Sequence, residues 1–134
     1  MQLPHGTLVA VADGTKLELY RNTGQEAHPV LTSLPVPSLE GHSHESGKRH
    51  RSSAANPDDQ LIAEDSFIAA VADWLNHQAL EGKVEHVVVI AAPRALGELR
   101  RHYHHALKEK LVAELDKDLI GRSVAEGSRH EEIQ

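Results

Sequence analysis

The sequence predicts a single α/β domain built on a mixed β-sheet, and three patterns support this. Two short runs, TLVAVA at 7–12 and EHVVVIAA at 85–92, are apolar throughout, as expected of strands buried on both faces. A segment after the first run alternates apolar and polar residues, which is typical of a half-buried strand. Apolar residues at helical spacing precede and follow the second run. With 134 residues and no internal repeat, we expect one domain over 1–126 and a frayed tail at 127–134.

The first third of the chain is expected to form a three-stranded meander. Thr7–Ala12 is the buried strand, and Asp13-Gly14 after it is a two-residue hairpin signal. Lys16–Arg21, KLELYR, alternates and forms the second strand, and Asn22-Thr23-Gly24 marks the next turn. Pro29–Leu34 forms a third strand, which its flanking prolines place at a sheet edge.

A long polar loop at 36–56 leads into a well-marked helix. Connections of more than about 12–15 residues without secondary structure are usually functional or disordered. The run Asn56-Pro57-Asp58-Asp59 combines an N-cap, a first-turn proline and two carboxylates at the positive end of the helix dipole. Apolar residues recur at helical spacing from Phe67 to Leu75, and we expect the helix to end at Glu81, before Gly82.

The second half repeats a strand and a helix. Glu85–Ala92 is the clearest strand of the sequence, and Pro93 begins a helix that we expect to continue to Leu111. The apolar stripe of this helix consists of Leu96, Leu99, Tyr103 and Leu107. Residues 111–119 fit either a continuation of the helix or a short strand, and 123–126 fit a last helical turn.

Composition narrows the classes of function. The formal charge of −6 argues against a general nucleic-acid binder and against DNA as a partner, although a local basic patch can still hold a phosphate. The chain has no cysteine, and its eleven histidines lack a His-Glu-x-x-His pattern, so we predict neither a metal nor another cofactor. The sequence shows no signal peptide and no run of about 20 apolar residues, so we expect a cytoplasmic protein without membrane partners.

The loop and one helix start hold the candidate binding residues. The basic run Lys48, Arg49, His50 and Arg51, with Ser52 and Ser53 beside it, can bind RNA phosphates; the alternative is a solvated loop. Arg94 follows Pro93 at the end of the strongest strand, where ligands often bind in α/β sheets, so it either contacts an anion or is a solvated arginine after a structural proline. Asp13 ends another strand; it either serves as a metal-binding nuclease carboxylate or closes the hairpin turn.

Several blocks of the sequence resemble a known family. The blocks are PHGTLVAVADGTKLELYRN, SGKRHRSSAANPDDQ, EDSFIAAVADWLN and VVVIAAPRALGELRRHYH, between about Pro4 and Val124. They resemble the bacterial host attachment proteins, described as required for attachment to host cells, which are related to the middle domain of archaeo-eukaryotic peptide-chain release factors. The resemblance implies a ribonuclease-H-like α/β fold in which a loop before a long helix acts at the ribosome.

The resemblance also implies a function, with one departure. Residues 41–56 stand where release factors carry the hydrolytic Gly-Gly-Gln, but this triplet is absent here. We therefore expect a translation-associated module that binds RNA or the ribosome without that motif. Two alternatives stay open: a hydrolase, acting on the peptidyl-tRNA ester through His50 or Ser52 or as a nuclease through Asp13, and a non-enzymatic regulator of surface attachment. The sequence leaves open whether the protein is an enzyme, and it leaves the oligomeric state open.

Overall fold

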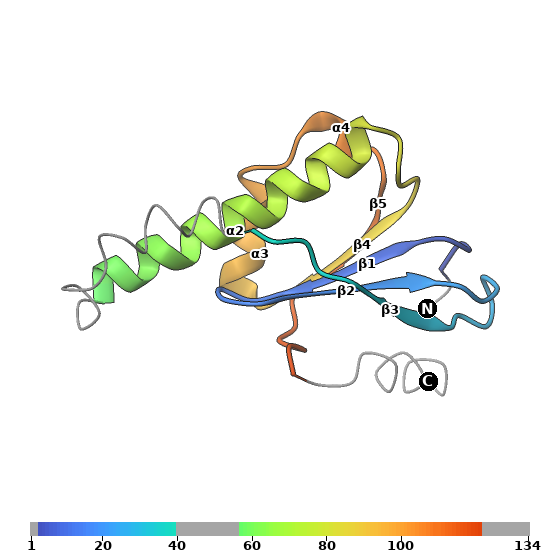
Figure 1. Ribbon diagram of the computed structural model, residues 1–134, viewed down its shortest axis with the longest axis horizontal. Helices are drawn as coiled ribbons and strands as arrows, with labels where there is room; N and C mark the ends of the chain where they lie inside the picture. Colours follow the sequence, from blue (N-terminus) through green and yellow to red (C-terminus); the bar gives the residue numbers. More distant parts are fainter. Residues whose placement is uncertain (1–2, 40–56, 122–134) are drawn as a thin grey trace.

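The computed structural model describes residues 3–39 and 57–121, and a five-stranded sheet lies at its centre (Figure 1). The strand order is β3-β2-β1-β4-β5. The strands are β1 (Leu8–Ala12), β2 (Leu17–Asn22), β3 (Leu31–Leu34), β4 (Val87–Ala91) and β5 (Leu111–Leu115). The strands β1, β4 and β5 are parallel, whereas β2 is antiparallel to both β1 and β3. The predicted α/β class, with its mixed sheet and N-terminal meander, is confirmed.

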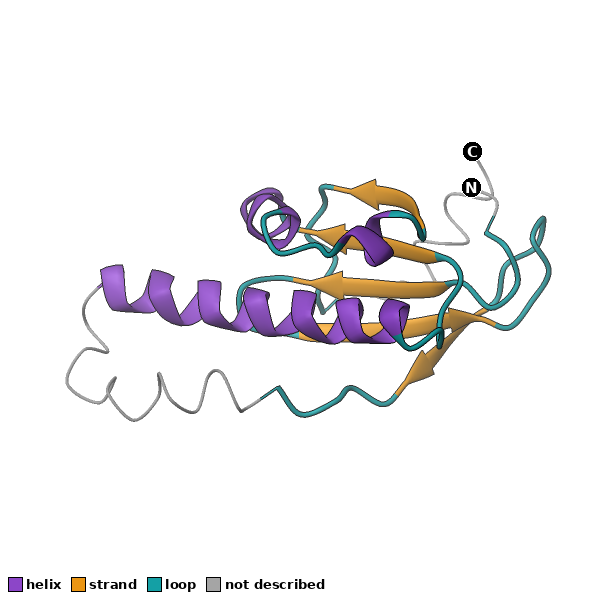
Figure 2. Ribbon diagram, turned by 90° about the horizontal axis from the view of Figure 1, so that it is seen from above, coloured by secondary structure: helices purple, strands orange, loops and turns teal. Residues whose placement is uncertain are grey.

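Three helices of the described residues pack over one face of this sheet (Figure 2). They are α2 (Pro57–Leu80), α3 (Pro93–Arg100) and α4 (His105–Lys108). The strand order advances in one direction from β1 to β4 to β5, so right-handed crossovers place both connections on the same face. The main core lies between these helices and the sheet, where Leu75 of α2, Leu99 of α3 and Val89 of β4 are all buried.

The central strands are buried on both faces, which explains their continuous apolar sequence. Leu8 and Ala10 of β1 face the helices, whereas Val9 and Val11 join Val88 in a second cluster on the opposite face. Leu119 and Ile120, which follow β5, pack against this second cluster. Because side chains alternate across a strand, one apolar run supplies both layers.

Helix α2 is much longer than the sheet that it covers. Its 24 residues span about 36 Å, whereas a five-residue strand spans about 17 Å. Its buried residues begin at Ile68, whereas Gln60, Leu61 and Ile62 are exposed. The first half of α2 therefore projects beyond the end of the sheet (Figures 1 and 2).

The C-terminal end of α2 agrees with the sequence prediction to within a residue. Gly82 has a φ of 73°, and its N–H donates to Ala79 O while Lys83 N–H donates to Gln78 O. This pair of hydrogen bonds is the Schellman arrangement, which favours glycine because its left-handed backbone tolerates no β-carbon well.

The prediction of one continuous helix from Pro93 to Leu111 is wrong. Helix α3 ends at Arg100, and α4 begins at His105 with the His104 side chain as its N-cap. Asn76 of α2 holds the break: its Nδ2 donates to His102 O (2.9 Å), and its Oδ1 accepts from His104 N–H (2.8 Å). The predicted stripe still packs against the main core, although Tyr103 is only partly buried.

The ambiguous segment after α4 is a strand. Residues Leu111–Leu115 form β5, and a bulge at Val112 shifts the register between Val87↔Leu111 and Val88↔Ala113. Bulges gather at sheet edges, although they are rare between parallel strands such as these. The predicted helical turn at 123–126 and the tail at 127–134 lie outside the described residues. Within the described ranges, no helix is both long and apolar enough to cross a membrane.

Candidate functional site

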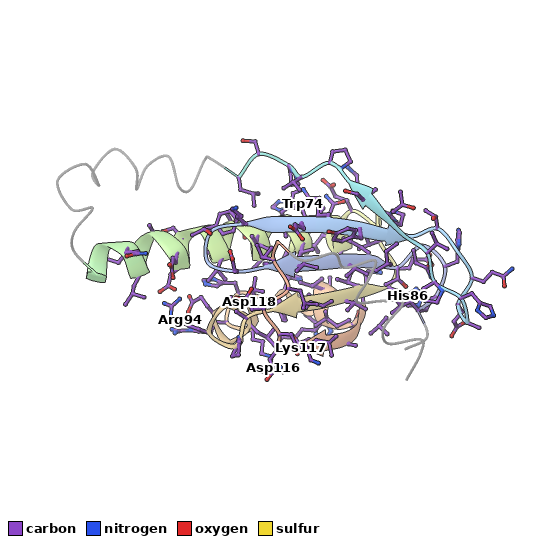
Figure 3. All side chains as sticks on the ribbon, turned by 90° about the horizontal axis from the view of Figure 1, so that it is seen from below. Trp74, His86, Arg94, Asp116, Lys117 and Asp118 are labelled. Atoms are coloured by element: carbon purple, nitrogen blue, oxygen red, sulfur yellow. The ribbon has the colours of Figure 1, made fainter. Side chains whose placement is uncertain are left out.

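The three parallel strands β1, β4 and β5 end at the same edge of the sheet, and this edge is the candidate site. Ligands of open α/β sheets bind outside the carboxyl ends of the strands, where successive connections leave in different directions. Here β1 continues into the turn toward β2, whereas β4 continues into α3. Figure 3 shows Arg94 and Asp116 near this end of the sheet and His86, which precedes β4, at the other.

Asp13 closes the turn between β1 and β2. Its Oδ1 accepts hydrogen bonds from Thr15 N–H (2.8 Å), Lys16 N–H (2.7 Å) and the Thr15 hydroxyl (3.2 Å). The turn does not use a left-handed glycine, because Gly14 is not among the residues with positive φ. The aspartate side chain stabilises this turn. Its geometry favours the hypothesis that Asp13 closes the hairpin turn over the hypothesis that it binds a metal in a nuclease.

Gly14 lies against the Glu64 side chain of α2, so a larger residue at position 14 would make that side chain shift. A β-carbon there would lie 2.9 Å from the Glu64 carboxylate of α2. Arg94 at the start of α3 contacts the same region, with Nη1 3.5 Å from Glu64 Oε1 and Nη2 2.8 Å from Asp65 Oδ1. The Arg94 side chain is about half exposed. The turn between β1 and β2 therefore meets α2 and α3 at one point. Arg94 connects α3 to the projecting half of α2.

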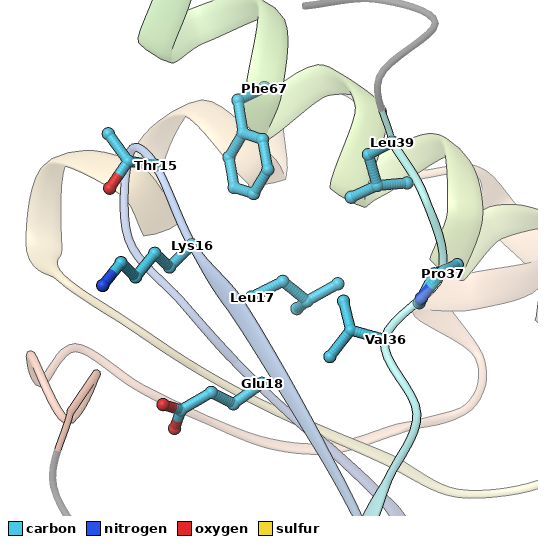
Figure 4. Close-up of a pocket in the computed structure, with 8 residues that line it drawn as sticks. All are labelled: Thr15, Lys16, Leu17, Glu18, Val36, Pro37, Leu39 and Phe67. Carbon is cyan, nitrogen blue, oxygen red and sulfur yellow. The ribbon is translucent and has the colours of Figure 1, made fainter.

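Two adjoining cavities open beside Phe67 at this edge. One has a volume of about 370 Å³ and lies between the residues from Thr15 to Glu18 and those from Val36 to Leu39. The other, of about 320 Å³, lies between the Gly14–Thr15 turn and α2 from Gln60 to Phe67. Figure 4 shows Phe67 and Leu39 facing Leu17 across the first cavity, with Val36 and Pro37 on a third side. Its walls are mostly apolar, and Lys16 and Glu18 lie along one rim.

A third cavity, of about 300 Å³, is lined by one face of α3 and by the end of β5. Arg100 donates to Glu114 Oε1 from Nε (3.1 Å) and lies 2.9 Å from it through Nη2. Tyr103 Oη and Glu114 Oε2 are buried, and neither makes a hydrogen bond of ordinary geometry with a described residue, although Glu114 lies close enough to affect the tyrosine hydroxyl. Burial, followed by the nearby Glu114 charge, raises the pKa of Tyr103 well above its usual value.

The predicted binding residues fall mostly outside the described ranges. Lys48, Arg49, His50, Arg51, Ser52 and Ser53 all lie in 40–56, which the structure does not describe. Of the predicted phosphate-binding residues, Arg94 alone lies in the described ranges, and it pairs with two carboxylates. Its contact with an RNA phosphate stays a prediction.

The histidines and carboxylates in and just after α3 and α4 form separate pairs. His102 Nε2 lies 3.1 Å from Glu98 Oε2, and His105 Nε2 lies 2.9 Å from Glu109 Oε2. In the described ranges, no group of three or more such side chains is arranged to hold a metal ion.

Sequence reasoning missed the cavities beside Phe67. It placed Phe67 in the apolar stripe of the helix, and the residue does pack against the main core, but only partly buried. The signal that was available is the pair of prolines, Pro35 and Pro37, just after the third strand. Prolines do not continue a β-ladder, so they indicate that the chain leaves the sheet there.

Comparison with known proteins gives one family. A family model described as bacterial archaeo-eukaryotic release factor family 12 matches residues 6–127 of the chain. No curated protein matches the chain significantly. The match supports the release-factor part of the resemblance seen in the sequence, and it does not bear on attachment to host cells.

Proposed function

The chain belongs to bacterial archaeo-eukaryotic release factor family 12, and on that premise we propose that it is a translation-related module that binds RNA or the ribosome. A role in translation would place its action in the cytoplasm. The absence of Gly-Gly-Gln from the sequence leaves no basis for proposing release-factor hydrolysis.

The observation that carries this proposal is the projecting half of α2. Helix α2 begins at Pro57, well beyond the end of the sheet, and its buried face begins only at Ile68. Isolated helices of about ten residues are marginal in water, so this half needs supporting contacts. Arg94 supplies one of them through Glu64 and Asp65. A supported, projecting helix end can carry the residues that precede it in the sequence to a partner.

Those preceding residues have the composition of a phosphate-binding segment. Lys48, Arg49 and Arg51 precede the start of α2 in a chain whose net charge is −6. The charge of the whole chain opposes contact with RNA, so binding must depend on where the basic residues are concentrated. The proposal therefore assigns binding to this segment and not to the protein surface in general.

Ribosome co-sedimentation over a range of salt concentrations tests the proposal. The triple variant Lys48→Ala/Arg49→Ala/Arg51→Ala is expected to bind more weakly. The slope of log affinity against log salt should fall by about two, since each lost contact with single-stranded RNA changes it by about 0.7. A matched control, Lys83→Ala/Arg101→Ala/Lys108→Ala, removes the same charge from exposed positions away from the projecting end of α2. Failure of the wild-type protein to sediment with ribosomes at low salt would refute the proposal.

A further inference from the structure

We propose that the groove beside Phe67 binds one unpaired nucleobase of an RNA strand. The groove is the cavity of about 370 Å³ between Thr15–Glu18, Val36–Leu39 and Phe67. Its volume lies within the range of small-molecule sites, about 300–1,000 Å³. The inference rests on the proposed function and names the chemical group that this part of the protein recognises.

The edge of β2 supplies to the groove a backbone donor and acceptor that no residue of 3–39 or 57–121 pairs with. Asp13 N–H donates to Lys16 O and Asn22 N–H donates to Thr7 O, so the even-numbered residues of β2 direct their backbone groups toward β1. The N–H and C=O of Leu17 therefore point to the other side. There β3 offers no partner, because pairing of β2 with β3 begins only at Leu19↔Leu34.

This arrangement suits the edge of a base. The groove combines apolar walls with one N–H and one C=O from a single residue, and the edge of a nucleobase carries donors and acceptors at a similar spacing. The prolines Pro35 and Pro37 flank Val36 and coincide with the end of the β3 ladder at Leu34. The chain beyond Leu34 thus forms a wall of the groove instead of occupying the edge of β2.

The walls suit the faces of a base. Phe67 presents a partly exposed aromatic ring to the cavity, opposite Leu17 and beside Leu39. Stacking on an aromatic side chain is the commonest way in which proteins hold unpaired bases, and it is largely independent of sequence. The ring therefore provides affinity, and the Leu17 backbone groups provide orientation.

Lys16 at the rim favours RNA over an apolar peptide, although Glu18 beside it carries the opposite charge. Lys16 is exposed and forms no ion pair with any described residue. The Glu18 carboxylate already accepts hydrogen bonds, Oε1 from the Tyr20 hydroxyl (3.2 Å) and Oε2 from Gly121 N–H (3.3 Å). A peptide strand could use the apolar walls and the β2 edge, but it would give Lys16 no counter-charge, whereas the phosphate of a nucleotide would.

Two measurements on the full chain test the groove: binding of short oligoadenylate RNA by fluorescence anisotropy, and ¹H–¹⁵N shifts on adding adenosine monophosphate. We expect the Leu17 amide to shift. Phe67→Leu, which keeps the apolar volume, should weaken oligonucleotide binding at least fivefold, and so should Val36→Phe, which fills the groove from a position 47% exposed. Lys16→Ala should lower the salt slope by about 0.7, and the control Lys83→Ala should not change it.

Circular dichroism and urea unfolding identify any variant that fails to fold. If one of the two groove variants, Phe67→Leu or Val36→Phe, does not fold, the other still tests binding in the groove. Affinities of both groove variants within twofold of wild type would overturn the inference, as would shifts of Leu17 caused by an apolar peptide and not by the nucleotide. The two proposals fail separately. If the triple variant of Lys48, Arg49 and Arg51 loses ribosome binding while both groove variants keep it, the groove proposal fails and the proposed function stands. If the wild-type protein binds neither ribosomes nor RNA, both fail.

Discussion

Asn76→Ala is expected to destabilise the protein more than any exposed substitution in α2. Asn76 is 8% exposed, and its side chain is the only described group that bonds both sides of the break between α3 and α4. Alanine would leave His102 O and His104 N–H without these partners at partly buried positions. The break would then lose the contacts that turn the chain from α3 toward β5.

The size of the effect follows from the two hydrogen bonds. Each contributes about 0.5–1.5 kcal/mol net, and leaving a buried partner unsatisfied costs more, so their loss totals about 2–3 kcal/mol. Alanine recovers about 0.5 kcal/mol because it is the better helix former. The net loss of about 2 kcal/mol corresponds to a roughly 30-fold rise in the ratio of unfolded to folded protein. With an ordinary urea dependence, the unfolding midpoint should fall by about 1 M.

Equilibrium urea unfolding of the purified chain, followed by circular dichroism, measures this shift. Gln78→Ala is the matched control, since Gln78 lies on the same helix and its side chain forms none of the described hydrogen bonds. Hydrogen exchange at the His104 amide gives a local readout, and we expect faster exchange in Asn76→Ala. Equal midpoints for the two variants, together with unchanged exchange at His104, would refute the role assigned to Asn76.

Two further predictions concern the candidate edge. Tyr103→Phe should leave stability nearly unchanged at neutral pH, because the hydroxyl has no described hydrogen-bond partner. The folded-state pKa of Tyr103 is raised above its ordinary value of 10.0, so the tyrosine contributes stability below that pH and loses it as pH rises further. Urea unfolding between about pH 9 and 11 should therefore show a decline in wild type that is smaller in Tyr103→Phe; equal declines would contradict this. Arg94→Ala should cost at most about 1 kcal/mol, because its partners are partly exposed, but should increase hydrogen exchange in α2 near Glu64. Protection there equal to wild type would show that Arg94 does not support the projecting helix.

The order and type of most elements follow from local patterns in the sequence. The apolar runs that became β1 and β4 are buried on both faces, and such burial requires a continuous apolar sequence. The end of α2 was predictable because Gly82 provides a backbone conformation that other residues adopt at a cost. The edge position of β3 follows from its flanking prolines for an equally local reason.

The candidate site was less predictable, because its geometry depends on residues far apart in the sequence. Arg94 was expected either to contact an anion or to be solvated, but it pairs with Glu64 and Asp65, which lie about thirty positions earlier. The groove beside Phe67 needs β2, the segment after β3, and α2 to meet. Periodicity alone assigned Phe67 to the core, and nothing in its immediate neighbours shows that one side stays open.

Local patterns were enough to predict the α/β class, the meander, the long helix and the basic segment before it, because hydrophobic periodicity, caps and turn residues act over a few positions. The break in the second helix and the contacts of Asp13 and Arg94 depend instead on how the elements pack together. The apolar spacing of 93–111 fits a continuous helix, yet two hydrogen bonds from Asn76 hold the chain open at His102 and His104. Those partners are brought together by packing of α2 against α3 and α4, which no local pattern encodes.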